Sequence, residues 1–328
     1  MPTNDPTKRR AIYKTMRVYS GSSNRPLAQK IADILGVELS GLALEQFANG
    51  EIYARYEETV RGADVFLIQS IAGENVNDML MEVLVAADAA KRASARSITA
   101  VITHYGYARQ DRKAAPREPI TARLVADLLE CSGVNNIITL DLHQGQIVGF
   151  FDVPVNHLSA LPLFADYYNA MNLDKENLVV VSPDVGRAKA AKKLSDMLDC
   201  DLAIAHKGRP HHNQAEVMGI IGDIKGKTCI INDDMIDTAG TLCANVRELK
   251  ALGAGDIYGC ATHGIFSGKA IERLNDAPIM ECVVTDAIPV EVGGKIKTIT
   301  VADEFASAIA AVYNEESVSR LIGGDFAM

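Results

Sequence analysis

Several features are missing from this 328-residue sequence, and each absence excludes a class of protein. No apolar run is long enough to cross a bilayer, so we expect no membrane partner. No apolar segment follows the basic residues 8–10, which leaves no sign of a secretory signal and favours the cytoplasm. The six cysteines are scattered without C-x-x-C pairs or nearby histidines at metal spacing. We therefore expect reduced thiols rather than disulfides or a zinc site.

An excess of positive charge is missing as well. The formal net charge is −9 and 48% of the residues are hydrophobic, which is typical of a soluble globular protein and argues against a nucleic-acid partner. Basic residues nevertheless gather locally, in residues 109–117 and 207–209. Local cations in an acidic chain favour a small, highly charged anionic substrate, although any single lysine can simply belong to a solvated surface.

The chain also lacks a linker rich in proline, glycine or serine, and it has no low-complexity segment. Short apolar runs alternate with helical patterns, which predicts an α/β fold with mostly parallel sheets flanked by helices. We expect strands at 16–20, 65–68, 97–103, 136–140, 178–181, 202–205 and 229–231. Helices are expected at 25–35, 76–92, 187–198 and 242–252.

Both halves of the chain show the same order of strand, helix, strand, basic loop, strand and acidic loop. The basic loops are residues 105–117 and 206–216, and the acidic loops are 141–146 and 233–241. We interpret this order as a tandem repeat of one α/β domain, with domains at 14–155 and 156–310 and a tail, 311–328, packing back on the first domain. Ligands bind at the carboxyl ends of parallel strands, so one bound molecule can lie between the two halves.

The most specific motif is the segment 229–242. A short apolar run predicts a buried strand, with Asp233 and Asp234 at its carboxyl end, before a helix. The turn between them consists of Asp237, Thr238, Ala239, Gly240 and Thr241. Free N–H groups and the positive end of the helix dipole make such a turn a phosphate site, and the carboxylates suit sugar hydroxyls or Mg²⁺. The alternative is a solvated turn with acidic capping residues.

Other candidate site residues follow strands or occupy polar loops. Arg109 and Arg112 can bind phosphates with two hydrogen bonds each, and Gln110 can bind a base or a ribose. Phe47 can stack on adenine while Asn49 and Glu51 read its edge, although such an aromatic more often packs within a hairpin. Asp184 is a suitable Mg²⁺ ligand, whereas His143 alone after a strand is more often structural. Lys207 and Arg209 lie in a loop that is too polar to pack.

Together these motifs resemble the ribose-phosphate diphosphokinase family over nearly the whole chain, from residue 20 to residue 319. Segment 229–242 is similar to the phosphoribosyl-pyrophosphate motif of the type I phosphoribosyltransferase fold. Residues 105–113 resemble the family's ATP-binding loop, 47–51 its adenine-binding segment and 206–213 its mobile catalytic loop. The resemblance implies two tandem type I phosphoribosyltransferase-like domains. Two positions depart from the family pattern: Asn49 stands where many members have Asp, and Gly208 replaces an Arg.

The resemblance also implies roles for particular residues. Arg109, Gln110, Arg112 and His143 would contact ATP, and Phe47, Asn49 and Glu51 would hold the adenine of ATP bound to a neighbouring subunit of a homohexamer. His143 and Asp184 stand at the family's Mg²⁺ positions. Lys207 and Arg209 match catalytic cations, and Asp233, Asp234 and residues 237–241 match the ribose 5-phosphate site.

The implied reaction transfers the β,γ-diphosphoryl group of MgATP to the 1-hydroxyl of ribose 5-phosphate, giving 5-phosphoribosyl 1-pyrophosphate and AMP for nucleotide biosynthesis. No residue stands out as the general base. A plain phosphoribosyltransferase would share residues 229–242 but needs neither an ATP loop nor a doubled domain. A non-catalytic regulatory subunit of the family should lose cations of the catalytic loop, whereas Lys207 and Arg209 are present.

Overall fold

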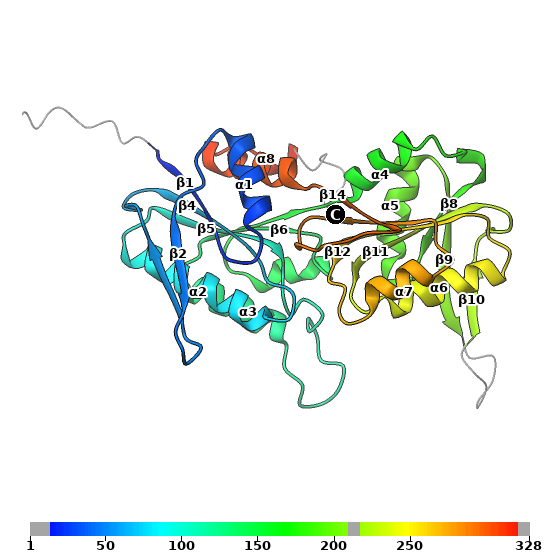
Figure 1. The fold of residues 1–328 in the computed structure, drawn as a ribbon, viewed down its shortest axis with the longest axis horizontal. Helices are drawn as coiled ribbons and strands as arrows, with labels where there is room; N and C mark the ends of the chain where they lie inside the picture. Colours follow the sequence, from blue (N-terminus) through cyan, green and yellow to red (C-terminus); the bar gives the residue numbers. More distant parts are fainter. Residues whose placement is uncertain (1–13, 209–216, 321–328) are drawn as a thin grey trace, which may run out of the picture.

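The computed structural model describes residues 14–208 and 217–320, and it confirms the α/β class. The first half contains a parallel five-stranded sheet, and an antiparallel hairpin of β2 (Leu42–Gln46) and β3 (Ile52–Tyr56) projects from it (Figure 1). In spatial order the sheet consists of β1 (Met16–Ser20), β4 (Asp64–Ser70), β5 (Ser97–His104), β6 (Asn136–Leu140) and β7 (Val155–Leu158). Its helices are α1 (Arg25–Leu35), α2 (Val76–Arg92) and α3 (Thr121–Ser132).

The second half contains a seven-stranded sheet in which β10 alone runs antiparallel. In spatial order its strands are β10 (Val217–Ile221), β9 (Asp201–Gly208), β8 (Leu178–Ser182), β11 (Thr228–Ile236), β12 (Ile257–Gly264), β13 (Glu281–Thr285) and β14 (Ile296–Ile299). The helices that follow in the chain are α4 (Leu161–Ala170), which ends the first half, and α5 (Ala188–Leu198), α6 (Gly240–Ala251), α7 (Ala270–Asp276) and α8 (Ala302–Asn314) of the second half. Short 3₁₀ turns lie at Gly145–Phe150, Lys175–Asn177, Val185–Arg187 and Val318–Arg320.

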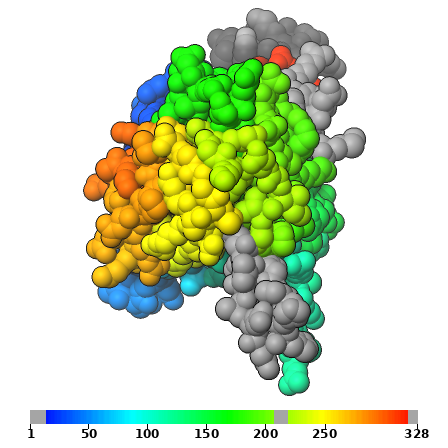
Figure 2. Space-filling model, turned by 90° about the vertical axis from the view of Figure 1, so that its right-hand side faces the viewer, coloured from blue at the N-terminus to red at the C-terminus, as the bar shows by residue number. Residues whose placement is uncertain are grey.

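Helices cover both faces of each sheet because successive strand residues point to opposite sides. In β4, Val65 and Leu67 pack with α2 and α3, whereas Phe66 and Ile68 pack with α1 and α8. In the second half, α4 and α5 cover one face, and α6 and α7 cover the other. Figure 2 faces this half, with the green α4 segment at the top and the yellow and orange α6 and α7 below it.

The two halves repeat one order of elements. The series from β1 to α4 runs β-α-β-β-β-α-β-α-β-β-α, and the series from β8 to α8 runs identically. In each series the second and third strands form an antiparallel pair, and the remaining strands run parallel. The predicted domain border after residue 155 falls inside β7, which pairs with β6 from Val155 to Leu158. A border after Leu158 would leave this sheet whole, and the domain limits stay a prediction.

The halves exchange their last helices. α4 packs on α5 of the second half, and α8 packs on α1 of the first half, where Figure 1 shows the two helices side by side. Val18 and Phe66 of the first half consequently share one apolar core with Val180 and Phe305. The Tyr313 hydroxyl donates to the main-chain oxygen of Lys14, so the end of α8 is fixed to the start of the first sheet. This shared core sets how the carboxyl ends of the two sheets face each other.

Some predicted limits need correction. The strand expected at 229–231 continues to Ile236, because β11 pairs with β12 as far as Ile236 and Gly264. Asp233 and Asp234 therefore lie within the strand rather than after it. β9 likewise extends to Gly208, where it pairs with β10, so Lys207 lies in a strand. All six cysteines are free thiols, and no helix in the described ranges is long and apolar enough to cross a membrane.

Candidate functional site

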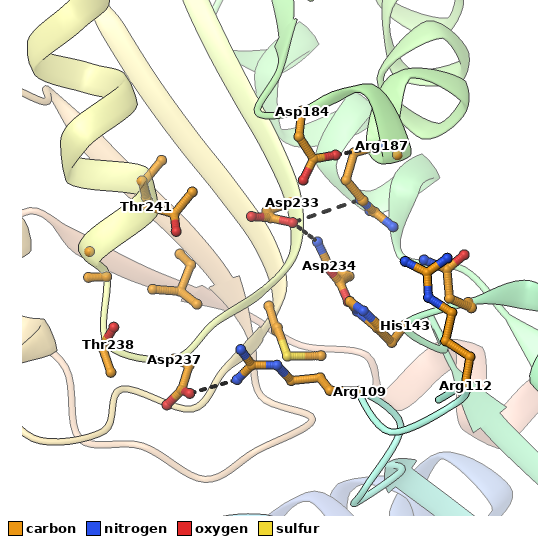
Figure 3. A pocket seen from close by; sticks show the side chains of 17 residues that line it. Arg109, Arg112, His143, Asp184, Arg187, Asp233, Asp234, Asp237, Thr238 and Thr241 are labelled. Atoms are coloured by element: carbon orange, nitrogen blue, oxygen red, sulfur yellow. Dashed lines mark hydrogen bonds and ion pairs between the residues drawn. The ribbon is translucent and has the colours of Figure 1, made fainter. Parts of the chain in front are cut away.

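A cavity of about 490 Å³ lies between the two halves, at the carboxyl ends of their strands. Figure 3 shows Arg109 and Arg112 entering from the first half, opposite Asp184 and Thr241 of the second. The lining residues are Arg109, Arg112, His143 and Gln144 from the first half, and Asp184, Gly186, Arg187 and residues 233–242 from the second. The cavity therefore brings together most of the residues predicted to bind ATP phosphates, ribose 5-phosphate and metal.

One wall of the cavity is the turn that begins α6. Ala239 precedes the helix with a left-handed φ of 59°, and no side chain caps the helix at this position. The first N–H groups of a helix have no acceptor within the helix, and the helix dipole adds partial positive charge there. Gly240 begins α6 without a side chain that would cover these groups. This geometry suits an anion, and phosphate binding at the turn stays a prediction.

Asp233 and Asp234 form a coupled, largely buried pair beside this turn. The main-chain N–H of Asp234 donates to Oδ1 of Asp233 at 2.9 Å. Burial, together with the hydrogen bond and charge of Asp234, raises the pKa of Asp233 to about 8. Burial also opposes ionisation of Asp234, but the hydrogen bond to His143 and the charge of Arg187 outweigh it and lower the pKa of Asp234. Two adjacent carboxylates at a cavity wall can accept hydrogen bonds from vicinal sugar hydroxyls.

His143 makes the first contact between the halves at this site. Its Nδ1 lies 2.7 Å from Oδ2 of Asp234. This hydrogen bond raises the pKa of His143, partly offset by burial. The bond fixes the ring through Nδ1. The other ring nitrogen, Nε2, takes no part in this bond, and the ring lines the cavity.

Arg109 makes the second contact between the halves. Its Nη1 donates to Oδ2 of Asp237 at 2.8 Å, which joins the predicted ATP loop to the predicted phosphate turn. The Arg109 side chain remains 60% exposed, so the pair is accessible to a competing anion. Exposed ion pairs contribute little to stability, and phosphate oxygens can therefore replace Asp237 at small cost.

The donor set of the cavity fits Mg²⁺ bound together with phosphates. In the described part of the chain no three His, Cys, Asp or Glu side chains converge as a complete metal site. Mg²⁺ usually takes only one or two protein carboxylates and fills its other positions with phosphate oxygens and water. Asp184 is exposed, and its Oδ1 accepts the main-chain N–H of Arg187 at 3.0 Å, which leaves Oδ2 for a cation.

Some predicted site residues lie away from the cavity. The side-chain oxygen of Gln110 accepts from the Thr121 hydroxyl at 2.6 Å, at the start of α3. Phe47 and Asn49 lie in the turn between β2 and β3, and Glu51 ends that turn. Phe47 is 51% exposed and lies 5.9 Å from the Tyr53 ring. One chain therefore does not bring this hairpin to its own cavity.

The two predicted catalytic cations are described only in part. Lys207 lies near the end of β9, paired with Met218 of β10. Arg209 falls outside the described residues, as does the pair His211 and His212. The catalytic roles of Lys207 and Arg209 stay predictions.

The structure adds Arg187, which the sequence interpretation missed. Its Nε lies 3.8 Å from Oδ1 of Asp233, and this buried nitrogen has no hydrogen-bond acceptor among the described residues. The guanidinium is the counter-ion of the buried Asp233–Asp234 pair. Two adjacent carboxylates with little exposure to water require such a charge, and Arg187 stands at the start of the helix predicted at 187–198, three residues after Asp184. Gln144 and Met235 also line the cavity without having been predicted.

Comparisons with known proteins agree with this geometry. A family model described as the N-terminal domain of ribose phosphate pyrophosphokinase matches residues 16–133, and the phosphoribosyl synthetase-associated domain matches residues 209–323. The ribose-phosphate pyrophosphokinase of Fusobacterium nucleatum is 48% identical over 94% of this chain and 98% of its own length. The corresponding protein of Clostridium acetobutylicum is also 48% identical, over 94% of this chain and 97% of its own length.

A solved structure shows the same architecture. The crystal structure of phosphoribosylpyrophosphate synthetase from Mycobacterium smegmatis aligns with a TM-score of 0.87 at 42% identity. The alignment covers 92% of this chain and 100% of the other. Full-length relatives at this identity, together with a site assembled from both halves, lead to one conclusion: the chain belongs to the ribose-phosphate pyrophosphokinase family.

Proposed function

We propose that this enzyme transfers the β,γ-diphosphoryl group of MgATP to the 1-hydroxyl of ribose 5-phosphate, producing 5-phosphoribosyl 1-pyrophosphate and AMP for nucleotide biosynthesis in the cytoplasm. Family membership supports 5-phosphoribosyl 1-pyrophosphate synthesis in general. The observation that carries the finer proposal is one cavity with an anion turn and sugar-binding carboxylates on one wall, and guanidinium groups on the other.

Ribose 5-phosphate occupies the wall formed by the second half. Its 5-phosphate accepts hydrogen bonds from the N-terminus of α6 and from the hydroxyls of Thr238 and Thr241. Its ring hydroxyls lie against the Asp233–Asp234 pair, whose carboxylate oxygens accept their hydrogen bonds. This orientation points the 1-hydroxyl towards the first half of the chain.

ATP occupies the wall formed by the first half. Arg109 and Arg112 bind its phosphates, Gln110 orients the loop that carries them, and His143 contacts the phosphate chain through Nε2. The adenine requires Phe47, Asn49 and Glu51 from a neighbouring subunit, because these residues lie outside the cavity of their own chain. The active unit is therefore a homo-oligomer, a hexamer by family resemblance.

Asp184 would hold Mg²⁺ directly together with phosphate oxygens, and His143 would act at the Mg²⁺ site through the phosphate that its Nε2 contacts. When bound, the ion neutralises negative charge on the triphosphate. The chain's own contribution is to place the 1-hydroxyl in line with the β-phosphorus and the departing AMP oxygen. Lys207 and Arg209 stabilise the charge that develops as AMP departs.

The test is turnover by the purified chain with and without ribose 5-phosphate. AMP and 5-phosphoribosyl 1-pyrophosphate should form in equal amounts with ATP and Mg²⁺, and neither should form without the sugar. A phosphoribosyltransferase would instead consume 5-phosphoribosyl 1-pyrophosphate when supplied with a nucleobase. A regulatory subunit would turn over neither set of substrates, and either result would refute the proposal.

A further inference from the structure

Asp141 has a strained backbone beside the site. It directly follows β6, has a positive φ of 35° and precedes His143 by two residues. A residue with a Cβ is strained in such a conformation, which persists only where its surroundings hold it. Those surroundings therefore help to decide where His143 lies.

Two residues of the second half, together with Ala160 at the start of α4, hold Asp141 in place. The Thr262 hydroxyl donates to Oδ2 of Asp141 at 2.7 Å, and the main-chain N–H of Ala160 donates to the same oxygen at 2.8 Å. Nε2 of His263 lies 3.1 Å from the main-chain oxygens of both Leu140 and Asp141. Because both acceptors are carbonyls, His263 carries its proton on Nε2. Thr262 and His263 are buried, at 3% and 1% exposure.

These contacts reach the partner of His143 as well. Thr262 and His263 lie on β12, which pairs directly with β11, and Met235 of β11 lies opposite His263. Asp234, which binds the His143 ring, immediately precedes Met235. The paired strands β11 and β12 therefore contact the backbone at Asp141 and also carry Asp234, the carboxylate that binds His143.

We propose that Thr262, Asp141 and His263 are positioning residues that set His143 against Asp234 across the two halves. None of the three lines the cavity, so they act through His143 and not on a substrate. The inference rests on the proposed function, because His143 is placed there on the ATP phosphates. It adds three residues that hold the site together without touching its ligands.

The repeat provides a matched control at the equivalent position of the first half. Thr103 precedes His104 on β5 as Thr262 precedes His263 on β12, and its hydroxyl donates to the main-chain oxygen of Ala287 at 2.7 Å. Asp286 accepts the main-chain N–H of Val301, just as Asp141 accepts that of Ala160. Asp286 has no positive φ, and the following Ala287 does not line the cavity. Thr103→Val thus removes a buried hydrogen bond of equal length that is made to neither Asp141 nor His143.

The experiment compares Thr262→Val, Thr262→Ser and Thr103→Val by melting temperature and steady-state kinetics. Both valine variants should lower the melting temperature, Thr262→Val by more because its hydroxyl donates to a carboxylate rather than to a carbonyl. Only Thr262→Val should lower kcat, by roughly 10- to 100-fold, since misplacing a reacting group by about 1 Å costs on the order of 100-fold. Thr262→Ser keeps the hydroxyl, so its kcat should lie within about threefold of the wild-type value. Equal kcat values for the two valine variants would overturn the proposal.

Two further variants test whether the effect passes through His143. In a His143→Ala background, Thr262→Val should cause no further loss of kcat, whereas multiplying losses would show independent action. Asp141→Gly takes up positive φ without strain and should fold, yet it should lose kcat as Thr262→Val does. Full kcat in Asp141→Gly would contradict the proposal even if Thr262→Val failed to fold.

A structural readout separates this inference from the proposed function. A crystal structure of Thr262→Val should show the Nδ1–Oδ2 contact of His143 and Asp234 opened beyond hydrogen-bonding distance, whereas Thr103→Val should keep it. An intact contact in Thr262→Val would refute the positioning role. A wild-type enzyme that formed no AMP from ATP and ribose 5-phosphate would refute the proposed function alone.

Discussion

The two halves share their order of elements but differ where β4 and β11 end. In the second half this place carries Asp233 and Asp234 and faces the cavity. In the first half it carries Gln69 and Ser70, and the Gln69 side chain fills the space. Its oxygen accepts from the main chain and the hydroxyl of Ser23 at 3.1 and 2.6 Å, and its nitrogen donates to Glu82 at 2.7 Å.

Glycine at position 21 confirms how tightly the first half is closed. A Cβ there would lie 2.3 Å from the Gln69 oxygen, so the Gln69 side chain would have to shift and give up its hydrogen bonds to Ser23. The equivalent strand end in the second half lines the cavity, where the Asp233 and Asp234 side chains are short and Gly240 has none. The repeated framework thus supplies two possible ligand sites, and side-chain packing closes one of them. The first half contributes cations and His143 to the site of the second.

The largest expected effect concerns the predicted catalytic loop of the second half. Lys207→Ala and Arg209→Ala should each lower kcat by ~10³–10⁵, as arginine fingers do in other phosphoryl-transfer enzymes, with KM changed only severalfold. Both cations serve one developing charge, so the double variant should lose less than the product of the single losses. A near-normal kcat with a raised KM for ATP in the single variants would show that the two cations bind ATP and do not act in the transition state.

Thr241→Val tests the open site of the second half. The variant keeps the shape of the side chain but removes the hydroxyl that would donate a hydrogen bond to the charged 5-phosphate. Losing a hydrogen bond to a charged group costs roughly 1.5–3 kcal/mol of binding free energy. Steady-state kinetics should show this loss mainly as a higher KM for ribose 5-phosphate. A loss confined to ATP would contradict the assignment of the anion turn.

His104 tests the buried contact between the two halves of the chain. It lies edge to face with His263, their ring centres 4.5 Å apart, and Asp234 is the nearby carboxylate. Burial, followed by the charge of His263, lowers the pKa of His104 well below its usual value. As pH falls below about 6.5, the unfolded chain therefore gains a proton that the folded chain does not, and stability decreases.

His104→Gln removes this contribution. Relative to wild type, its free energy of unfolding should rise by up to about 1.4 kcal/mol per pH unit below pH 6.5. The other titrating groups are common to both proteins and cancel in the difference. Denaturant titrations at pH 7.5, 6.5 and 5.5 measure it, and a difference independent of pH would show that His104 titrates normally in the folded state.

Ser23→Ala tests the closed end of the first half and has the smallest expected effect. Its hydroxyl accepts the main-chain N–H of Ser70 at 2.8 Å and donates to Gln69, so its loss should lower stability by about 1 kcal/mol. KM values for both substrates should stay unchanged, in contrast to Thr241→Val. A raised KM for either substrate would mean that the first-half end also binds a ligand.

Local patterns predicted the framework well. The limits of β1, α1, α2 and β6 match the expected ranges, because apolar periodicity and local caps determine them. α1, for example, begins after Asn24, whose side chain accepts from Leu27, and ends before Gly36 in the left-handed conformation. The extension of β11 was missed because residues 232–234 (Asn-Asp-Asp) interrupt the apolar run and owe their strand conformation to pairing with β12.

The contacts across the cavity could not be predicted in the same way. His143 and Asp234 are 91 residues apart, and Thr262 and Asp141 are 121 apart. Their meeting depends on the shared core and on the exchange of α4 and α8, for which no local pattern gives a signal. The sequence therefore identified His143 and Asp234 separately, but not that one orients the other.

A crystal structure with ribose 5-phosphate and a non-hydrolysable ATP analogue tests the central claim most directly. The account predicts the sugar phosphate on residues 237–241 and the triphosphate between this turn and Arg109 and Arg112. It also predicts that the adenine contacts Phe47 of a neighbouring subunit, and that the Gln69 end of the first half stays closed. A sugar phosphate bound at the Gln69 end, or an adenine held within a single chain, would contradict the account.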